Sequence, residues 1–242
     1  MARRVLVTGG AGYIGSVLCE HLLEAGYQVT ALDNLMYGQH SLFHLCANPG
    51  FEFVRGDVRD ESLLKSLLRE PEVVVPLAAV VGAGACDRDP WLAQSVNLEA
   101  IRLLNRLRGR QQVVIFPMTN SGYGARSGEM YCTEDTPLEP ISLYGRTKVR
   151  AEAEVLARPN AVSLRLATLF GMSPRMRLDL LVNQFVHAAV NGGYIVLFEK
   201  DFKRNYVHIR DVADCMIHCI KNAERMAGRP YNVGLDGANL SK

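Results

Sequence analysis

A glycine-rich turn near the N-terminus constrains the fold more than any other segment. Residues 4–8 read Arg-Val-Leu-Val-Thr and predict a buried strand, and residues 14–25 have the apolar spacing of a helix that ends at Gly26. Between them, glycines 9, 12 and 15 form the pattern G-x-x-G-x-x-G. Glycine allows a tight turn, a close backbone approach to a pyrophosphate, and close packing of helix on strand. The segment therefore predicts a dinucleotide-binding strand–helix unit.

Strand-like and helix-like segments alternate along the rest of the chain. Apolar runs predict strands at residues 27–32, 51–55, 73–75, 113–118 and 161–166, and helical spacing predicts helices at 61–68, 92–108 and 144–156. This alternation predicts an α/β fold with a Rossmann-type, doubly wound parallel sheet. After residue 165 the segments become shorter and more mixed. We expect a cofactor-binding Rossmann domain over residues 1–165 and a smaller substrate-binding lobe over residues 166–242, interleaved with the end of the sheet.

Composition excludes several classes of protein. Apolar residues make up 48% of the 242 residues and charged residues 21%, which excludes a disordered chain. Lysine and arginine number 27 against 25 acidic residues, so neither nucleic acid nor an anionic membrane is an expected partner. The longest apolar run, residues 73–86, is too short to span a bilayer, and the six cysteines have no paired spacing. We expect reduced thiols, a cytoplasmic location and no bound metal; Cys215, His218 and Cys219 share one helix face but lack a fourth ligand.

Two acidic residues follow predicted strands near the expected dinucleotide site. Asp33 ends the second strand, 18 residues after Gly15, where a carboxylate accepts hydrogen bonds from an adenosine ribose diol. No lysine or arginine occurs in residues 34–38, so NAD is favoured over NADP. Asp57 follows the third strand and is either a contact of the adenine edge or an ordinary turn residue.

Three polar residues form a candidate catalytic group. Tyr144 and Lys148 are four residues apart in a predicted helix, so their side chains lie on one face. An ammonium beside a phenol lowers the phenol pKa, which makes a tyrosine a usable general base. Thr119 ends the fifth strand, where open α/β sheets place ligands, and its hydroxyl can relay a proton to Tyr144. Asn97, in the helix before that strand, either supports this region or is a plain helix residue.

Together, these motifs resemble the NAD-dependent epimerase/dehydratase family of extended short-chain dehydrogenases/reductases. The matching segments are residues 8–15, 32–34, 56–58, 77–79, Asn97, 119–124, Tyr144 with Lys148, and 204–209. The resemblance implies that Tyr144 is the catalytic acid/base, Lys148 its pKa modifier and a ribose ligand, and Thr119 the relay hydroxyl. It implies that NAD is bound by Gly9, Gly12, Tyr13, Ile14, Gly15, Asp33, Asn34, Asp57, Val58, Leu77, Ala78, Ala79, Asn97, Tyr144 and Lys148.

The residues after Thr119 favour one reaction of the family. Dehydratases of the family have an Asp-Glu pair directly after the catalytic threonine, whereas this chain has Asn120 and Ser121. Tyrosine, a hydroxyl and NAD suffice for inversion at C4 of a nucleotide sugar through a 4-keto intermediate, and this isomerase activity is the expected one. Three alternatives remain: a dehydratase or decarboxylase with an acid from elsewhere such as Glu134, a 4-oxidoreductase, and a non-catalytic NAD-binding module.

The C-terminal segment is expected to bind the substrate, a UDP-sugar by resemblance. Arg204 is expected to bind the pyrophosphate, because the planar guanidinium donates in pairs to phosphate oxygens. Arg175 and Arg177 either assist it, bind a sugar carboxylate, or belong to a solvated loop, the reading favoured here. The expected substrate contacts are Thr119, Asn120, Ser121, Thr168, Asn183, Phe198 and Arg204. The resemblance also implies a homodimer formed through the helices that begin near Leu92 and Tyr144. It further implies a substrate lobe that is incomplete at the C-terminus, since relatives continue beyond residues 230–234.

Overall fold

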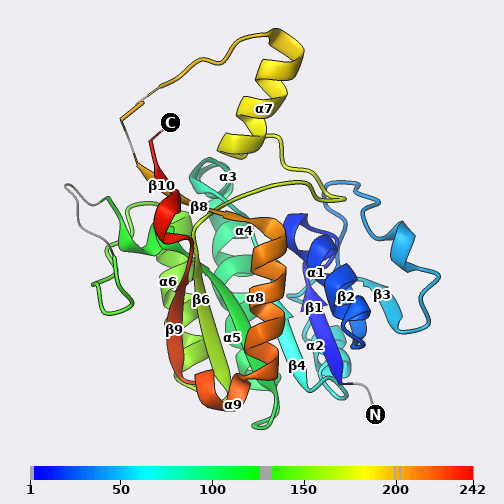
Figure 1. The fold of residues 1–242 in the computed structure, drawn as a ribbon. Coiled ribbons are helices and arrows are strands. Elements are labelled where there is room, and N and C mark those ends of the chain that lie inside the picture. Colours follow the sequence, from blue (N-terminus) through cyan, green and yellow to red (C-terminus); the bar gives the residue numbers. More distant parts are fainter. Residues whose placement is uncertain (1–2, 126–131, 199, 202, 242) are drawn as a thin grey trace.

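A seven-stranded parallel sheet forms the centre of the computed structural model, which describes residues 3–125, 132–198, 200–201 and 203–241 (Figure 1). The strand order is β3-β2-β1-β4-β5-β6-β9. All neighbouring pairs are parallel. The predicted Rossmann-type sheet is confirmed. Its strands are β1 (Arg4–Thr8), β2 (Gln28–Asp33), β3 (Phe51–Arg55), β4 (Val73–Pro76), β5 (Val113–Thr119), β6 (Ala161–Leu166) and β9 (Arg229–Val233).

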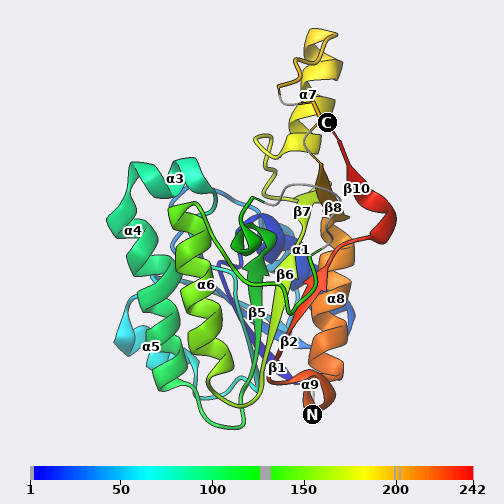
Figure 2. The same cartoon turned by 90° about the vertical axis from the view of Figure 1, so that its left-hand side faces the viewer.

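Helices cover both faces of this sheet, so the domain has three layers (Figure 2). One face packs against α1 (Tyr13–Glu24) and α8 (Ile209–Lys221), and the other against α2 (Glu61–Leu67), α5 (Ala100–Leu107) and α6 (Leu143–Leu156). In β1, Val5 and Val7 face the first core and Leu6 faces the second. Because central strands are buried on both faces, their sequences are continuous apolar runs rather than alternating ones.

The helix expected at residues 92–108 starts earlier and is not uniform. It begins as α4 (Pro90–Gln94), with Asp89 accepting a hydrogen bond from the Leu92 backbone amide at 2.9 Å, and continues through a π-helical turn, η2 (Ser95–Glu99), into α5. Proline at the first helical position explains the earlier start. The π turn contains Asn97, and π turns often mark functional positions. A short helix that the sequence analysis did not predict, α3 (Ala83–Arg88), precedes α4.

The segment after residue 165 divides between the main sheet and a small second sheet. Helix α8 packs on α1 and strand β9 pairs with β6, so both complete the large sandwich. The second sheet has the order β10-β8-β7, made of β7 (Thr168–Phe170), β8 (Arg204–His208) and β10 (Asn239–Leu240). Helix α7 (Leu181–Gly192) contacts β7 and extends away from the large sheet at the top of Figure 1. Part of residues 166–242 therefore belongs to the main sheet and its helix layer, and the division into two domains at residue 165 stays a prediction.

Shorter elements complete the described chain. These are η1 (Phe43–Leu45), η3 (Asn120–Tyr123), α9 (Ala223–Met226) and η4 (Asp236–Ala238). None of the helices in the described ranges is long and apolar enough to cross a membrane.

Candidate active site

A cavity of about 730 Å³ opens at the carboxyl ends of the parallel strands. This edge is where open α/β sheets bind ligands. The cavity wall contains most of the residues that the sequence analysis selected. These are Gly9, Gly12, Tyr13, Ile14, Gly15, Asp33, Asn34, Asp57, Val58, Leu77, Ala78, Ala79, Thr119, Asn120, Ser121, Tyr144, Lys148, Thr168 and Arg204.

The glycine-rich turn has no room for side chains on its inner surface. Gly9 has a φ of +70°, and a Cβ atom there would lie 2.5 Å from the Ala78 backbone nitrogen. A Cβ atom on Gly15 would overlap the Gly9 carbonyl oxygen. Gly12 is the N-cap of α1, so the free amides of that helix begin at the cavity. A bare backbone and a helix N-terminus are the features that a pyrophosphate requires, so the turn fits a dinucleotide.

Asp33 lies at the end of β2, in the cavity wall. The residue is 8% exposed, and its carboxylate accepts hydrogen bonds from the backbone amides of Ala11 at 3.1 Å and Leu35 at 2.8 Å. Gln39 Nε2 donates to the same carboxylate at 3.3 Å. Burial raises the pKa of Asp33, although the backbone donors act in the opposite direction. The carboxylate thus joins the glycine-rich turn to the end of β2 at the cavity wall.

Asp57 is already held by an arginine. The Arg59 guanidinium donates to both carboxylate oxygens, with Nε–Oδ1 at 2.8 Å and Nη2–Oδ2 at 2.6 Å. These hydrogen bonds lower the pKa of Asp57. Asp57 stabilises its own turn and also lines the cavity, while its contact with an adenine edge stays a prediction.

The three candidate catalytic residues meet in the cavity. Thr119 ends β5, and its hydroxyl accepts from the Ser121 amide at 3.2 Å and acts to lower the pKa of the Tyr144 phenol on α6. Lys148 is 4% exposed, and its Nζ lies 4.1 Å from the centre of the Phe116 ring. Thr119, Tyr144 and Lys148 thus line the same cavity, from the end of one strand and one face of α6.

Burial dominates the ionisation of this group. Desolvation raises the pKa of Tyr144 to about 12, against smaller lowering effects from Arg177 and Thr119. Desolvation also lowers the pKa of Lys148 to about 7, and the Glu152 carboxylate opposes this change. From the spacing of Tyr144 and Lys148 we expected the Lys148 ammonium to lower the phenol pKa. In the structure the positive charge that does so is that of Arg177.

Asn97 lies behind the cavity wall rather than in it, which corrects its expected role as a direct cofactor ligand. The side chain is 1% exposed; its Oδ1 accepts from the Val80 amide at 2.8 Å and its Nδ2 donates to the Val80 carbonyl at 2.9 Å. Residues 77–81 line the cavity, so Asn97 fixes the backbone of that wall. The π turn η2 carries Asn97 and holds its side chain against Val80.

Two of the expected substrate contacts lie outside the cavity. Asn183 is 6% exposed, and its amide is used within the protein: Oδ1 accepts from the Gly171 amide at 3.0 Å, and Nδ2 donates to Tyr13 Oη at 3.2 Å and to the Arg177 carbonyl at 3.0 Å. Phe198 follows α7 and is 75% exposed, away from the cavity lining. The structure therefore does not support these two expected contacts; the sequence does not specify how the segment around α7 is oriented.

Residues 171–180, here called the strap, supply side chains that the sequence analysis placed in a solvated loop. Arg177 lines the cavity near Tyr144 and forms a bidentate pair with Asp179, with Nε–Oδ1 at 2.6 Å. The Arg175 guanidinium lies 5.2 Å from the centre of the Tyr37 ring. The feature of the sequence that could have indicated this was the pair of arginines in the short loop after β7. The interpretation of these arginines as part of a solvated loop is wrong.

The alternative acid Glu134 is also away from the cavity lining. Its Oε1 accepts from the Asn232 backbone amide at 2.7 Å, so the side chain is directed to β9. Across the described part of the chain, no group of three or more histidine, cysteine, aspartate or glutamate side chains is arranged to hold a metal ion.

Comparison with known proteins agrees with this geometry. Residues 5–234 match the model of the NAD dependent epimerase/dehydratase family. A UDP-glucose 4-epimerase of Mycolicibacterium smegmatis is 33% identical over 245 residues, covering 96% of this chain and 77% of the relative.

Solved structures extend the comparison to both reaction types. A UDP-glucuronic acid 4-epimerase of Bacillus cereus, solved with UDP-glucuronic acid and NAD, is 26% identical with a TM-score of 0.84, covering 96% of this chain and 77% of that one. A dTDP-glucose 4,6-dehydratase of Streptomyces venezuelae, solved with NAD, is 29% identical with a TM-score of 0.85, covering 98% and 77%. The chain therefore belongs to the NAD-dependent epimerase/dehydratase family, a family of enzymes whose cofactor is NAD.

Proposed function

We propose that this protein is a nucleotide-sugar 4-epimerase that uses NAD and acts on a UDP-sugar. One observation carries the proposal: Thr119, Tyr144 and Lys148 line the same cavity as the glycine-rich turn and Asp33. A redox cofactor bound at the turn and a sugar held at Tyr144 would therefore share one enclosed space. The similarity to epimerases that act at C4 supports this choice.

Each residue of the site has a separate role in this reaction. Tyr144 takes the proton of the sugar hydroxyl and later returns it, and Thr119 supports the phenolate by hydrogen bonding. Arg177 places positive charge near this oxygen, and Lys148 lines the same cavity about one helical turn from Tyr144. Arg204, also in the cavity wall, is positioned for the substrate phosphates. Bound NAD supplies the hydride acceptor and donor at C4.

The cavity lacks the carboxylates that a dehydratase would use beside Thr119. Asn120 and Ser121 line the cavity at those positions, and Glu134 is hydrogen-bonded to β9 instead. Of the described residues that line the cavity, the carboxylates are those of Asp33, Asp57 and Asp179. The last two are paired with Arg59 and Arg177, and Asp33 is bound by backbone amides. Epimerisation needs no further acid.

The test is a product assay with purified protein. UDP-glucose, UDP-galactose, their N-acetylated forms and UDP-glucuronic acid are incubated with NAD and analysed by chromatography that separates C4 epimers. The acidic sugar is included because Arg175 and Arg177 line the cavity. We expect one pair to interconvert without net NADH. The control Tyr144→Phe should lose turnover by a factor of about 10²–10⁴ while it still binds NAD. Accumulation of a 4-keto sugar or stoichiometric NADH would instead indicate a dehydratase or a dehydrogenase.

We also propose a cytoplasmic homodimer. Helices α4, α5 and α6 lie side by side on one flank of the domain, which leaves their outer surface available to a second copy (Figure 2). Trp91 on α4 is 72% exposed there. Sedimentation as a dimer, with Trp91→Ala shifting the distribution toward monomer, is the expected result. A wild-type monomer at all concentrations would contradict it.

A further inference from the structure

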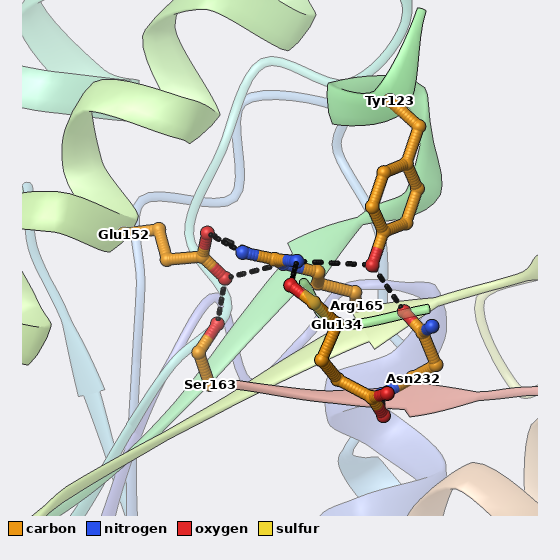
Figure 3. A network of polar contacts seen from close by, with 6 residues as sticks. All are labelled: Tyr123, Glu134, Glu152, Ser163, Arg165 and Asn232. Atoms are coloured by element: carbon orange, nitrogen blue, oxygen red, sulfur yellow. Dashed lines mark hydrogen bonds and ion pairs between the residues drawn. The ribbon is translucent and has the colours of Figure 1, made fainter. Parts of the chain in front are cut away.

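A buried ion pair lies behind the cavity, between α6 and β6 (Figure 3). Arg165 is 6% exposed and Glu152 is 3% exposed. The guanidinium donates to both carboxylate oxygens, with Nη2–Oε2 at 2.9 Å and Nε–Oε1 at 3.1 Å. The Ser163 hydroxyl donates to Oε1 at 2.6 Å, so the carboxylate has partners on two sides. Neither charged residue lines the cavity, and any effect on the reaction must act through other residues.

The guanidinium of this pair also holds the turn that follows Thr119. Arg165 Nη1 donates to Tyr123 Oη at 3.0 Å and to the Glu134 carbonyl at 2.9 Å. The Tyr123 hydroxyl donates onward to Asn232 Oδ1 at 2.6 Å. Figure 3 shows the Tyr123 ring descending from η3 to meet the guanidinium. Since Tyr123 ends η3 and Asn120 begins it, this contact fixes the turn that places Asn120 and Ser121 in the cavity wall.

The carboxylate of the pair belongs to the helix face that carries the catalytic residues. Tyr144, Lys148 and Glu152 are spaced by four residues on α6, so each lies about one helical turn from the next. The charged end of Lys148 is buried over the Phe116 ring, which solvates an ammonium less well than water does. Glu152 is the carboxylate whose charge favours the ammonium form.

The other titratable groups around this point act differently. Arg177 on the strap and Cys86 on α3 act electrostatically on Tyr144 rather than on Lys148. Arg165 on β6 lies on the far side of Glu152 and is occupied with that carboxylate and with Tyr123. Strand β5 contributes the uncharged Phe116 ring. Glu152 is therefore the group whose removal changes the charge that Lys148 experiences.

We propose that Glu152 and Arg165 are positioning residues for the reaction: Glu152 keeps Lys148 in its charged form, and Arg165, through Tyr123, holds the Thr119–Tyr123 turn against the substrate. A buried ion pair adds little stability compared with a well-packed apolar pair, so stability alone is a weak reason for this arrangement. The inference rests on the proposed function, because its kinetic readouts require a substrate that the enzyme converts.

The first test removes the charge of Glu152. The variant Glu152→Gln keeps the shape of the side chain, and Glu154→Gln is the matched control, because Glu154 lies on the same helix but pairs with Arg102 at the surface. We expect Glu152→Gln to move the alkaline fall of kcat to lower pH by about one pH unit, since Lys148 then loses its proton more easily. The double variant Glu152→Gln/Arg165→Gln leaves neither charge of the ion pair buried without its partner, and it should move the pH profile of kcat in the same direction. A uniform loss of activity with an unmoved profile in both variants would overturn this part.

The second test separates the turn from the charge. The variant Tyr123→Phe removes the hydroxyl that Arg165 contacts, and Tyr231→Phe is the matched control, because its hydroxyl donates to the Met226 carbonyl away from the cavity. We expect Tyr123→Phe to lower kcat/KM for the nucleotide sugar by about 3- to 10-fold, with NAD affinity and pH profile unchanged. Arg165→Lys, which keeps the charge but not the planar fork, should behave in the same way. Equal kinetics for Tyr123→Phe and Tyr231→Phe would overturn this part.

A third measurement separates failure of this inference from failure of the proposed function. The ionisation of Lys148 is followed by NMR of protein labelled with 13C at the lysine ε-carbons, with Lys148→Met to assign the signal. Loss of the Glu152 carboxylate should move the ionisation of Lys148 to lower pH in Glu152→Gln but not in Glu154→Gln. If no sugar of the panel is converted, this titration still decides the role of Glu152. An unchanged titration would refute it.

Discussion

The buried ammonium of Lys148 should make this protein less stable than a variant without it. The perturbation is Lys148→Met, which keeps an unbranched side chain of similar length and removes the charge. Lys148 is 4% exposed, and burial lowers its pKa from 10.5 to about 7. Because the folded protein binds this proton less tightly than the unfolded chain does, the lysine opposes folding wherever the unfolded chain is protonated.

The magnitude follows from the pKa of the two states. At 1.36 kcal/mol per pH unit, a fall from 10.5 to about 7 corresponds to about 5 kcal/mol against the charged form. Methionine forfeits the contact of the ammonium with the Phe116 ring, which is worth about 1 kcal/mol. Allowing for relaxation around the side chain, we expect Lys148→Met to be more stable at pH 7 by about 2–3 kcal/mol. For a domain of this size, that raises Tm by about 4–12 °C.

The sign of the pH dependence makes the test specific. The destabilisation is fully present below pH 7 and declines as the pH rises toward 10.5, where the unfolded chain also loses the proton. Urea denaturation of wild type and Lys148→Met at several pH values between 6 and 10, without added nucleotide, measures the difference. Lys65→Met, on the exposed side of α2, is the control and should show no such trend. The reasoning is refuted if Lys148→Met is no more stable at pH 7, or if its advantage does not shrink with rising pH.

Three further substitutions test the site and its supports. Gly9→Ala places a Cβ atom 2.5 Å from the Ala78 nitrogen at a positive φ. Isothermal titration should therefore show loss of NAD binding, and urea denaturation should show a free energy of unfolding that is lower by about 1–3 kcal/mol. Asn97→Ala removes both hydrogen bonds to Val80, so the same denaturation assay should show a free energy of unfolding that is lower by about 2–3 kcal/mol, and NAD should bind more weakly. An unchanged NAD affinity would contradict the inference that Asn97 fixes the backbone of the cavity wall. Asp60→Ala removes the N-cap bond to the Leu63 amide at 3.0 Å, and should lower stability by about 1 kcal/mol with kcat unchanged.

The sequence predicted the central architecture because local patterns specify it. Apolar runs bounded by turn residues predict strands that are buried on both faces, and β1, β3 and β6 appear at the expected residues. Asp60 caps α2 as its position before a helical pattern indicates. Glycines at positions 9, 12 and 15, between a strand and a helix, predict a dinucleotide-binding turn. These features depend on neighbours a few residues away, which are visible in a sequence.

The orientation of the C-terminal segment depends on contacts between distant residues. The strap is joined to the start of α1 through the Tyr13 hydroxyl, which donates to the Gly171 carbonyl at 2.7 Å, and through Ser173, which donates to the Tyr13 carbonyl at 2.8 Å. These contacts bring Arg177 to Tyr144 and turn Asn183 inward. No periodicity in residues 171–183 encodes them, and both side chains were misread for that reason.

The sequence by itself therefore determined which residues form the strands, the phosphate-binding turn and the Tyr144–Lys148 pair, since each follows from spacing along one element. Only the tertiary structure decided which side chains complete the cavity and which charges they carry. Desolvation raises the pKa of Tyr144 and lowers that of Lys148, and Glu152 and Arg165 form a pair behind them. Burial and charge–charge distances are properties of the packed chain, because they arise only when segments far apart in sequence exclude water from the same space.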